Sequence, residues 1–322
     1  MLYMLNEDTE VRSSKKRNIF SGIAADMKKN YQLYLVILCP LIYLIVFKYV
    51  PMYGVQLAFK KYVATDGIWG SPFVGFDHFI RLFKSPQFVR ILKNTLGVSL
   101  YQLAAGFPMP IILALMLNST TNKRFKKTVQ MVTYMPHFIS TVVLAGMILQ
   151  FLNPKLGLMA QIVKNLGGTP VDVMGKPEFF QSIYVWSGIW QTTGWGAIIY
   201  LAALASVPHS LHEAAMIDGA SKFKRIIHID IPGILPTAVI LLIMRAGRIM
   251  NIGFEKVFLL QNNLNLRASE IISTYVYKVG LASAAPNFSY ATAIGLFNSV
   301  INLVLIVAVN SIAKRYSDTS LW

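Results

Sequence analysis

The sequence predicts an all-α membrane protein with six transmembrane helices. Of its 322 residues, 55% are hydrophobic and only 14% are charged, and the mean hydropathy is +0.52. A soluble domain usually carries about 25% charged residues. The chain also contains six apolar stretches of about the length that a membrane span needs, roughly 20 residues. These stretches are residues 32–50, 91–118, 129–152, 182–204, 233–250 and 290–312.

The chain begins with a polar and basic segment, residues 1–31, that has no apolar core. A cleavable signal peptide requires such a core, so we predict a cytoplasmic tail followed by a first span that is retained. Cys39 is the single cysteine and lies inside that span. An intrachain disulfide is therefore impossible, and we expect this side chain to serve packing.

The segment between the first two spans is expected to lie outside and to contain a short helix. Its apolar side chains recur at helical spacing, at Phe76, Phe79, Ile80 and Phe83. This pattern is typical of a helix that lies in the membrane interface. A docking surface for a partner is the alternative interpretation.

Glycine and proline mark further breaks in the helices. Gly106, Pro108 and Pro110 are expected to kink the long second span. Residues 153–181 and 251–289 are predicted to form irregular loops on the outer side.

A polar and basic segment, residues 205–232, separates the fourth and fifth spans and is expected to form two short helices. Ser210 and Glu213 have the spacing of a capping box, in which each side chain bonds the backbone of the other. Gly219 stands where a helix-ending residue with positive φ would fall. The first helix is therefore expected to be short and well defined at both ends.

The second helix of this segment is expected to run between Ser221, which can cap its start, and Pro232, which should end it. His209 and His212 flank the first helix. We interpret both as surface polar groups.

Polar side chains inside the last three spans are candidates for a substrate path, because such groups normally face a bundle interior or a water-filled route. They are Trp190 and Gln191 in the fourth span, Arg245 and Arg248 in the fifth, and Asn298 and Asn302 in the sixth. Aromatic faces stack on sugars, amides bond hydroxyls, and arginines attract carboxylates. The alternatives are an interfacial aromatic belt, interhelical hydrogen bonds and snorkelling arginines.

Basic residues predict an orientation with both termini inside. The inside segments then hold 15 Lys and Arg in about 79 residues, and the outside loops hold 11 in about 108. The inside segments are residues 1–31, 119–128, 205–232 and 313–322. Much of the net charge of +16 therefore lies beside lipid headgroups, and no motif for nucleic-acid binding accompanies it.

Several kinds of chemistry are excluded by the residue patterns. The pair Gly175-Lys176 lacks the first glycine and the Ser or Thr of an ATP-binding P-loop. The five histidines show no zinc-type spacing, so we expect neither a metal nor a cofactor. The six spans contain no Asp or Glu, which speaks against a membrane-embedded glycan enzyme. An ion-coupled secondary transporter of sugars would also need such a carboxylate. This class of transporter nevertheless remains the alternative interpretation.

Residues 213–236 resemble the signature loop of importer permeases in the ATP-binding-cassette (ABC) superfamily. The matching positions are Glu213, Ala214, Ala215, Asp218, Gly219, Ala220, Phe223, Ile226 and Pro232. The segments Lys48–Gly54, Tyr134–Ser140, Phe288–Phe297 and Ser320–Trp322 resemble the subgroup for complex carbohydrates. The similarity covers roughly residues 25–322. Within the subgroup, the chain is similar to permeases for acidic saccharides such as rhamnogalacturonan and alginate fragments, the alginate importer among them.

The resemblance implies a type I permease fold over residues 32–312, with a cytoplasmic tail at 313–322. It implies that residues 213–219 form a coupling helix in a cytoplasmic coupling loop, residues 205–232. The implied contacts with the ATPase subunits are Glu213, Ala214, Ala215, Met216, Asp218 and Gly219.

The implied partners are an ATPase pair, an extracytoplasmic solute-binding protein, a saccharide, membrane lipid, and a second permease that is either a similar chain or a copy of this one. The expected location is the cytoplasmic membrane, and the chain itself is expected to catalyse no reaction.

Overall fold

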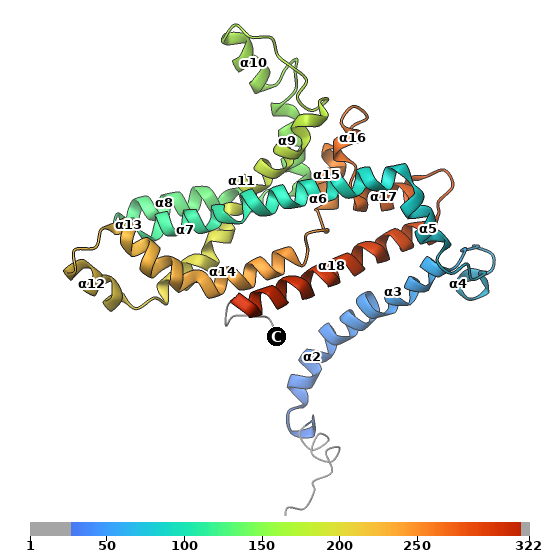
Figure 1. Ribbon diagram of the computed structural model, residues 1–322, viewed down its shortest axis with the longest axis horizontal. Coiled ribbons are helices and arrows are strands. Elements are labelled where there is room, and N and C mark those ends of the chain that lie inside the picture. Colours follow the sequence, from blue (N-terminus) through green and yellow to red (C-terminus); the bar gives the residue numbers. More distant parts are fainter. Residues whose placement is uncertain (1–26, 317–322) are drawn as a thin grey trace, which may run out of the picture. The chain divides into compact units, whose positions relative to one another are not determined.

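The computed structural model describes residues 27–316, and most of them lie in helices (Figure 1). Four helical runs are long and apolar enough to cross a membrane, and the number is six if each of two bent pairs counts as one span. The four are Tyr31–Phe59, Pro86–Asn118, Lys222–Ala246 and Phe288–Arg315, and the bent pairs are Lys123–Phe138 with Thr141–Phe151 and Pro177–Ala205 with His209–Ile217. The predicted all-α membrane fold is confirmed. Most of the two predicted tails lies outside the described residues.

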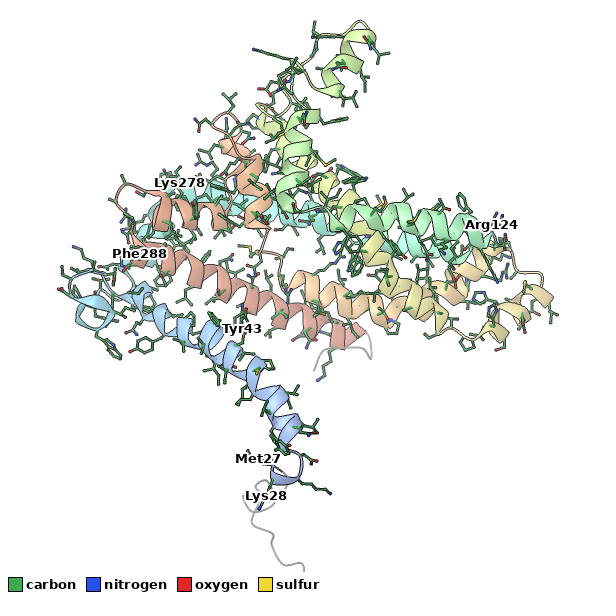
Figure 2. The ribbon with its side chains drawn as sticks, turned by 180° about the vertical axis from the view of Figure 1, so that it is seen from behind. Met27, Lys28, Tyr43, Arg124, Lys278 and Phe288 are labelled. Carbon is green, nitrogen blue, oxygen red and sulfur yellow. The ribbon has the colours of Figure 1, made fainter. Side chains whose placement is uncertain are left out.

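The unit that ends at Val55 contains the first predicted span as one apolar helical run. It consists of α2 (Tyr31–Leu44), a π-helical turn η1 (Ile45–Tyr49) and α3 (Val50–Met52). Tyr43, labelled in Figure 2, contacts Phe47 with ring centroids 5.1 Å apart. The most apolar part of this run has no residue buried within the chain, as expected of a helix whose surroundings are lipid or another protein.

A short amphipathic helix precedes the second span. The connection contains η2 (Tyr53–Phe59), α4 (Gly67–Gly70) and α5 (Asp77–Lys84). In α5, His78 and Leu82 are buried, whereas Ile80 and Phe83 are exposed. The predicted helix is confirmed, and its location in the membrane interface stays a prediction.

The second span is interrupted at the predicted point. It consists of α6 (Pro86–Gly106) and α7 (Pro108–Asn118), with Phe107 between them. Pro110 has no N–H to donate to the carbonyl of Gly106, four residues earlier, so the α-helical ladder is broken there.

The third predicted span, residues 129–152, is sharply bent. It comprises α8 (Lys123–Tyr134), η3 (Met135–Phe138) and α9 (Thr141–Phe151), and the chain turns by 99° before α9. Ser140 starts the new helix, because its Oγ accepts a hydrogen bond from the N–H of Val143 at 3.3 Å. The apolar pattern continues through the turn, which is why hydropathy alone did not reveal it.

The fourth span, α11 (Pro177–Ala205), packs closely against α8 and follows the small helix α10 (Leu158–Asn165), which lies in the loop predicted to be irregular. Gly194 is the point of closest approach to α8. A Cβ atom at this position would collide with the carbonyl oxygen of Thr133. Only glycine allows the two backbones to lie this close.

We expect Gly194→Ala to lower the melting temperature of the purified permease, since backbone atoms must move apart to admit the methyl group. Overpacking of this kind costs about 1–3 kcal/mol. Gly146→Ala in α9 is the matched control, because a Cβ atom there would meet nothing within 4 Å. Equal melting temperatures for the two variants would contradict the close packing of α8 and α11.

The coupling loop contains α12 (His209–Ile217), α13 (Lys222–Arg225) and the π-helical η4 (Ile226–Asp230), which continues into α14 (Ile231–Ala246). The expectation that Pro232 ends the second helix is wrong. The N–H of Ile231 bonds the carbonyl of Ile226, five residues earlier. This wider π-helical turn accommodates the proline within a continuous helix.

Residues 251–289 are more ordered than the irregular loop that we predicted. They form α15 (Phe254–Leu260), α16 (Leu266–Ser269), α17 (Ile272–Tyr277) and the π-helical η5 (Lys278–Ala282). Val257, Leu260 and Ile271 lie in the same buried cluster as residues of α6 and α11. Glu270 is buried as well, and it pairs with Arg90 at 2.6 Å and with Lys278 at 3.3 Å.

The sixth span, α18 (Phe288–Tyr316), packs against α14 and α17. Arg124, in the basic segment of residues 119–128, lies at one end of the helices that follow Val55, and Lys278 and Phe288 lie at the other (Figure 2). The helix α12 lies at the same end as the start of α8 (Figure 1). The basic segment and the coupling loop therefore occupy the same end of the bundle.

Candidate functional site

The first candidate site is the tip of the coupling loop. The helix at this tip, α12, runs from His209 to Ile217, so it begins before the expected coupling helix of residues 213–219. Gly219 has a φ of +75°. The N–H of Ala220 donates to the carbonyl of Ala215 at 2.8 Å, and the N–H of Gly219 donates to Met216 at 3.1 Å. This bond pair is the Schellman motif, so the predicted helix-ending role of Gly219 is confirmed.

The capping predictions for this loop have different outcomes. The capping box of Ser210 and Glu213 is wrong, because Pro208 occupies the N-cap position of α12 and no side chain caps the helix. Proline sets φ near its helical value, so the helix begins directly after it and Ser210 lies inside. The cap of the second helix is confirmed: Ser221 Oγ accepts a bond from the N–H of Lys224 at 3.4 Å.

Several apolar side chains point away from the protein at this tip. Ile217 is 88% exposed and Phe223 is 70% exposed, and Met216 is also exposed. Glu213, Asp218 and Gly219 lie on the same exposed segment. A contiguous exposed apolar group with charged neighbours is typical of a protein interface.

The base of α12 is tied to the bundle by a buried carboxylate. Asp230 of η4 is 3% exposed, and its Oδ1 lies 3.4 Å from His212 Nε2 and accepts a bond from Asn118 Nδ2 at 3.3 Å. His212 is therefore not the surface polar group that we expected, whereas His209 is exposed. Through these contacts α12 is held to both η4 and the end of α7.

The second candidate site is a cavity of about 440 Å³ between α6, α11 and the end of α14. Its polar lining residues are Ser99, Gln102, Thr192, Arg245, Arg248 and Asn251. No carboxylate lines it. Two predicted path residues, Arg245 and Arg248, thus lie together at a cavity that has a positive lining.

The interrupted second span positions one of these arginines. Arg245 Nη1 donates to the carbonyl oxygen of Gly106 at 3.3 Å, which is the oxygen that Pro110 leaves without its helical partner. The guanidinium also lies 5.7 Å from the ring centroid of Phe107. The kink between α6 and α7 therefore holds Arg245 at the cavity rather than in lipid.

Asn298 and Asn302 lie on one face of α18, as predicted, and reach the cavity through a third residue. The Nδ2 atoms of both donate to Asn251 Oδ1 at 3.1 Å. Asn302 Oδ1 also accepts a bond from the N–H of Met250 at 3.2 Å. Because Asn251 itself lines the cavity, the two asparagines support its wall.

The structure does not bring Trp190 and Gln191 to this cavity. Gln191 Nε2 donates to the carbonyl of Ile139 at 2.8 Å, which joins α11 to the turn before α9. Trp190 is 51% exposed. A role for these two side chains in a substrate path stays a prediction.

Sequence reasoning missed Gln102, Asn251 and Lys256. The first two line the cavity. Lys256 is buried next to Tyr184 and Gly188 of α11. The only signal for Lys256 was a charged residue within the apolar run of residues 254–260. Across residues 27–316, no three His, Cys, Asp or Glu side chains gather as a metal ion would require.

The sequence is similar to those of known transport permeases. Residues 106–318 match the family described as binding-protein-dependent transport system inner membrane component. Protein LplB of Bacillus subtilis is 40% identical over 92% of this chain and 93% of its own length. The polygalacturonan/rhamnogalacturonan transport system permease protein YteP of the same organism is 42% identical over 90% of each chain.

Two solved structures are similar over nearly their whole length. A chain in the crystal structure of a bacterial alginate ABC transporter, in complex with an alginate pentasaccharide-bound periplasmic protein, is 40% identical. It has a TM-score of 0.84, with 92% of this chain and 99% of that chain covered. A chain of a bacterial ABC transporter involved in the import of the acidic polysaccharide alginate is 41% identical, also with a TM-score of 0.84, and covers 91% of this chain and 98% of its own length.

These similarities agree with the helical membrane fold. They also decide against the ion-coupled secondary transporter. The chain belongs to the family of binding-protein-dependent transport system inner membrane components, and it is a non-catalytic permease subunit of a carbohydrate ABC importer.

Proposed function

We propose that this permease imports acidic oligosaccharides, of the uronate type found in alginate and pectin, with energy from ATP that a separate subunit hydrolyses. The observation that carries the proposal is the cavity at α14, which is lined by Arg245 and Arg248 and by no carboxylate. A guanidinium and a carboxylate form charge-assisted hydrogen bonds that are roughly twice as strong as neutral ones. The names of the related YteP and alginate transporters support the same substrate class.

The coupling loop is the proposed docking site for the ATPase pair. The proposed contacts are Glu213, Ala214, Ala215, Met216, Asp218 and Gly219, with the exposed Ile217 beside them. Closure of the ATPase pair on ATP would move α12, and the spans would change from inward-facing to outward-facing. A ligand shifts such an equilibrium only through its different affinity for the two states.

Two further partners complete the proposed importer. One chain supplies part of a path, so a second permease, similar to this one or a copy of it, forms the remainder. An extracytoplasmic binding protein delivers the saccharide, as the periplasmic protein named in the alginate transporter complex suggests. Coexpression of this permease with the second permease, the binding protein and the ATPase tests the proposal. The complete set should take up uronate oligosaccharides, and omission of the ATPase should abolish uptake.

We propose that the protein lies in the cytoplasmic membrane with both termini inside. The basic segment at Arg124 and the coupling loop share one end of the bundle, which supports this orientation (Figure 2). With Cys39 replaced by serine, single cysteines at Asn122 and Ser320 should be protected from a membrane-impermeant thiol reagent in intact cells. Cysteines at Gly167 and Gln261 should react. Labelling at Ser320 would mean that the count of spans is wrong.

A further inference from the structure

A buried lysine without a counter-ion lies beside the cavity. Lys256 of α15 is 8% exposed. Its Nζ donates to the carbonyl of Tyr184 at 2.9 Å and lies 4.8 Å from the centroid of that ring. None of the carboxylates in the described residues lies within 4 Å of it, since the ion pairs there involve Arg90, His212 and Lys278. A buried cation without a partner is costly, so its presence calls for a function.

The ammonium group lies close to a residue that lines the cavity. A Cβ atom built at Gly188 would be 3.3 Å from Lys256 Nζ and 3.9 Å from Gln102 Nε2. The lysine and the glutamine therefore approach the same point of α11, where glycine leaves room for them. Gln102 lines the cavity, as do Ile189 and Thr192, which follow Gly188 on α11.

Two cations of this region, Lys256 and Arg245, approach α11 at different points along its length. Arg245 lies next to Gly196, where a Cβ atom would be 3.9 Å from its Nη2. Gly188 and Gly196 are eight residues apart, about 12 Å along the helix. In the proposed orientation Pro177 is at the outer end of α11, so Lys256 would lie nearer the outer side and Arg245 nearer the inner side.

We propose that Lys256 determines substrate specificity by binding a carboxylate of the acidic saccharide at the outer end of the cavity. This inference rests on the proposed function. The Nζ atom has three N–H donors, and one of them is used by Tyr184. A carboxylate would supply the missing counter-charge, whereas a neutral sugar would leave the lysine uncompensated.

The pKa of the lysine agrees with this interpretation. Burial lowers the pKa of Lys256 to about 8. The ammonium therefore stays mostly protonated at neutral pH, and a carboxylate that binds beside it would stabilise the protonated form further.

The experiment compares uptake of uronate and neutral oligosaccharides of equal length by the assembled importer. Lys256→Met is expected to lower uronate uptake at least about tenfold and to leave neutral uptake within about threefold of wild type. Lys256→Arg should retain most uronate uptake because it keeps the charge. Lys278→Met is the matched control, since that lysine pairs with Glu270 away from the cavity, and it should preserve the ratio of the two uptakes.

A second measurement separates specificity from structure. Removal of an unpaired buried charge should leave the melting temperature of the Lys256→Met permease unchanged or raised. A lower melting temperature with equal loss of both substrates would assign Lys256 a structural role and overturn the proposal, as would unchanged uronate uptake. If wild type shows no preference for uronates, the proposed function itself fails. If wild type prefers uronates and the Lys256→Met variant keeps the same preference, the inference about Lys256 fails and the proposed function stands.

Discussion

Glu213→Lys and Gly219→Val are each expected to leave the permease in the membrane and to abolish ATP-driven uptake. Glu213 is exposed on α12, so charge reversal changes the docking surface without disturbing the bundle. Gly219 has a φ of +75°, which a β-branched residue adopts at a cost of about 1–3 kcal/mol. The Schellman bonds to Ala215 and Met216 would then be lost. Two quantities are measured: the amount of ATPase that copurifies with the permease, and the rate at which that ATPase hydrolyses ATP when substrate-loaded binding protein is added.

Two control variants match these changes at positions outside the coupling loop. Gly167 has a φ of +79° and, like Gly219, meets no atom within 4 Å at its Cβ position. Gly167→Val therefore imposes the same backbone strain in the segment after α10 and should preserve copurification. Glu255→Lys reverses an exposed charge on α15 and should do the same. Full transport by both coupling-loop variants would show that α12 is not the docking element.

The double variant Arg245→Gln/Arg248→Gln is expected to lose uptake of uronates about 100-fold and to retain most uptake of neutral oligosaccharides. A hydrogen bond to a charged group contributes about 1.5–3 kcal/mol, and each 1.4 kcal/mol corresponds to a factor of ten. Glutamine keeps an N–H donor for the carbonyl of Gly106, so the kink between α6 and α7 should persist. The measurement is competitive uptake of oligosaccharides of equal length.

The controls for this variant distinguish charge from structure. Arg245→Lys/Arg248→Lys keeps both charges and should restore much of the uronate uptake. Arg267→Gln removes an exposed positive charge from α16, outside the cavity, and should have little effect. If the glutamine variant transports uronates as well as wild type does, the arginines do not recognise the substrate. The acidic-substrate proposal then loses the observation that supports it.

The sequence predicted the helical elements well where a local signal was sufficient. The helix end at Gly219 and the cap at Ser221 depend on backbone and side-chain chemistry within a few residues. The break at Gly106 likewise follows from two nearby prolines. Hydropathy located most of the spans, because burial in lipid demands a continuous apolar stretch.

The wrong predictions concern features that tertiary packing decides. Pro232 was expected to end a helix, but a π-helical turn changes the hydrogen-bond register just before it. The turn before α9 leaves the apolar pattern unchanged. The run that contains Lys256 is too short for periodicity to distinguish a core helix from a loop. Tertiary packing also decides which polar residues reach the cavity. Arg245 and Arg248 line it, whereas Trp190 of α11 does not.

The continuity of α13, η4 and α14 has a mechanical consequence. No loop intervenes between the coupling helix's anchor at Asp230 and the cavity residue Arg245. These residues are 15 positions apart, about 22 Å along a helical rod. A tilt of this helical segment by about 5° about its end at Asp230 would displace the guanidinium by about 2 Å, which exceeds the tolerance of a hydrogen bond. If the proposed ATPase tilts this segment, the hydrogen bond from Arg245 to the Gly106 carbonyl would break, and the contacts of the arginine with a bound saccharide would change with it.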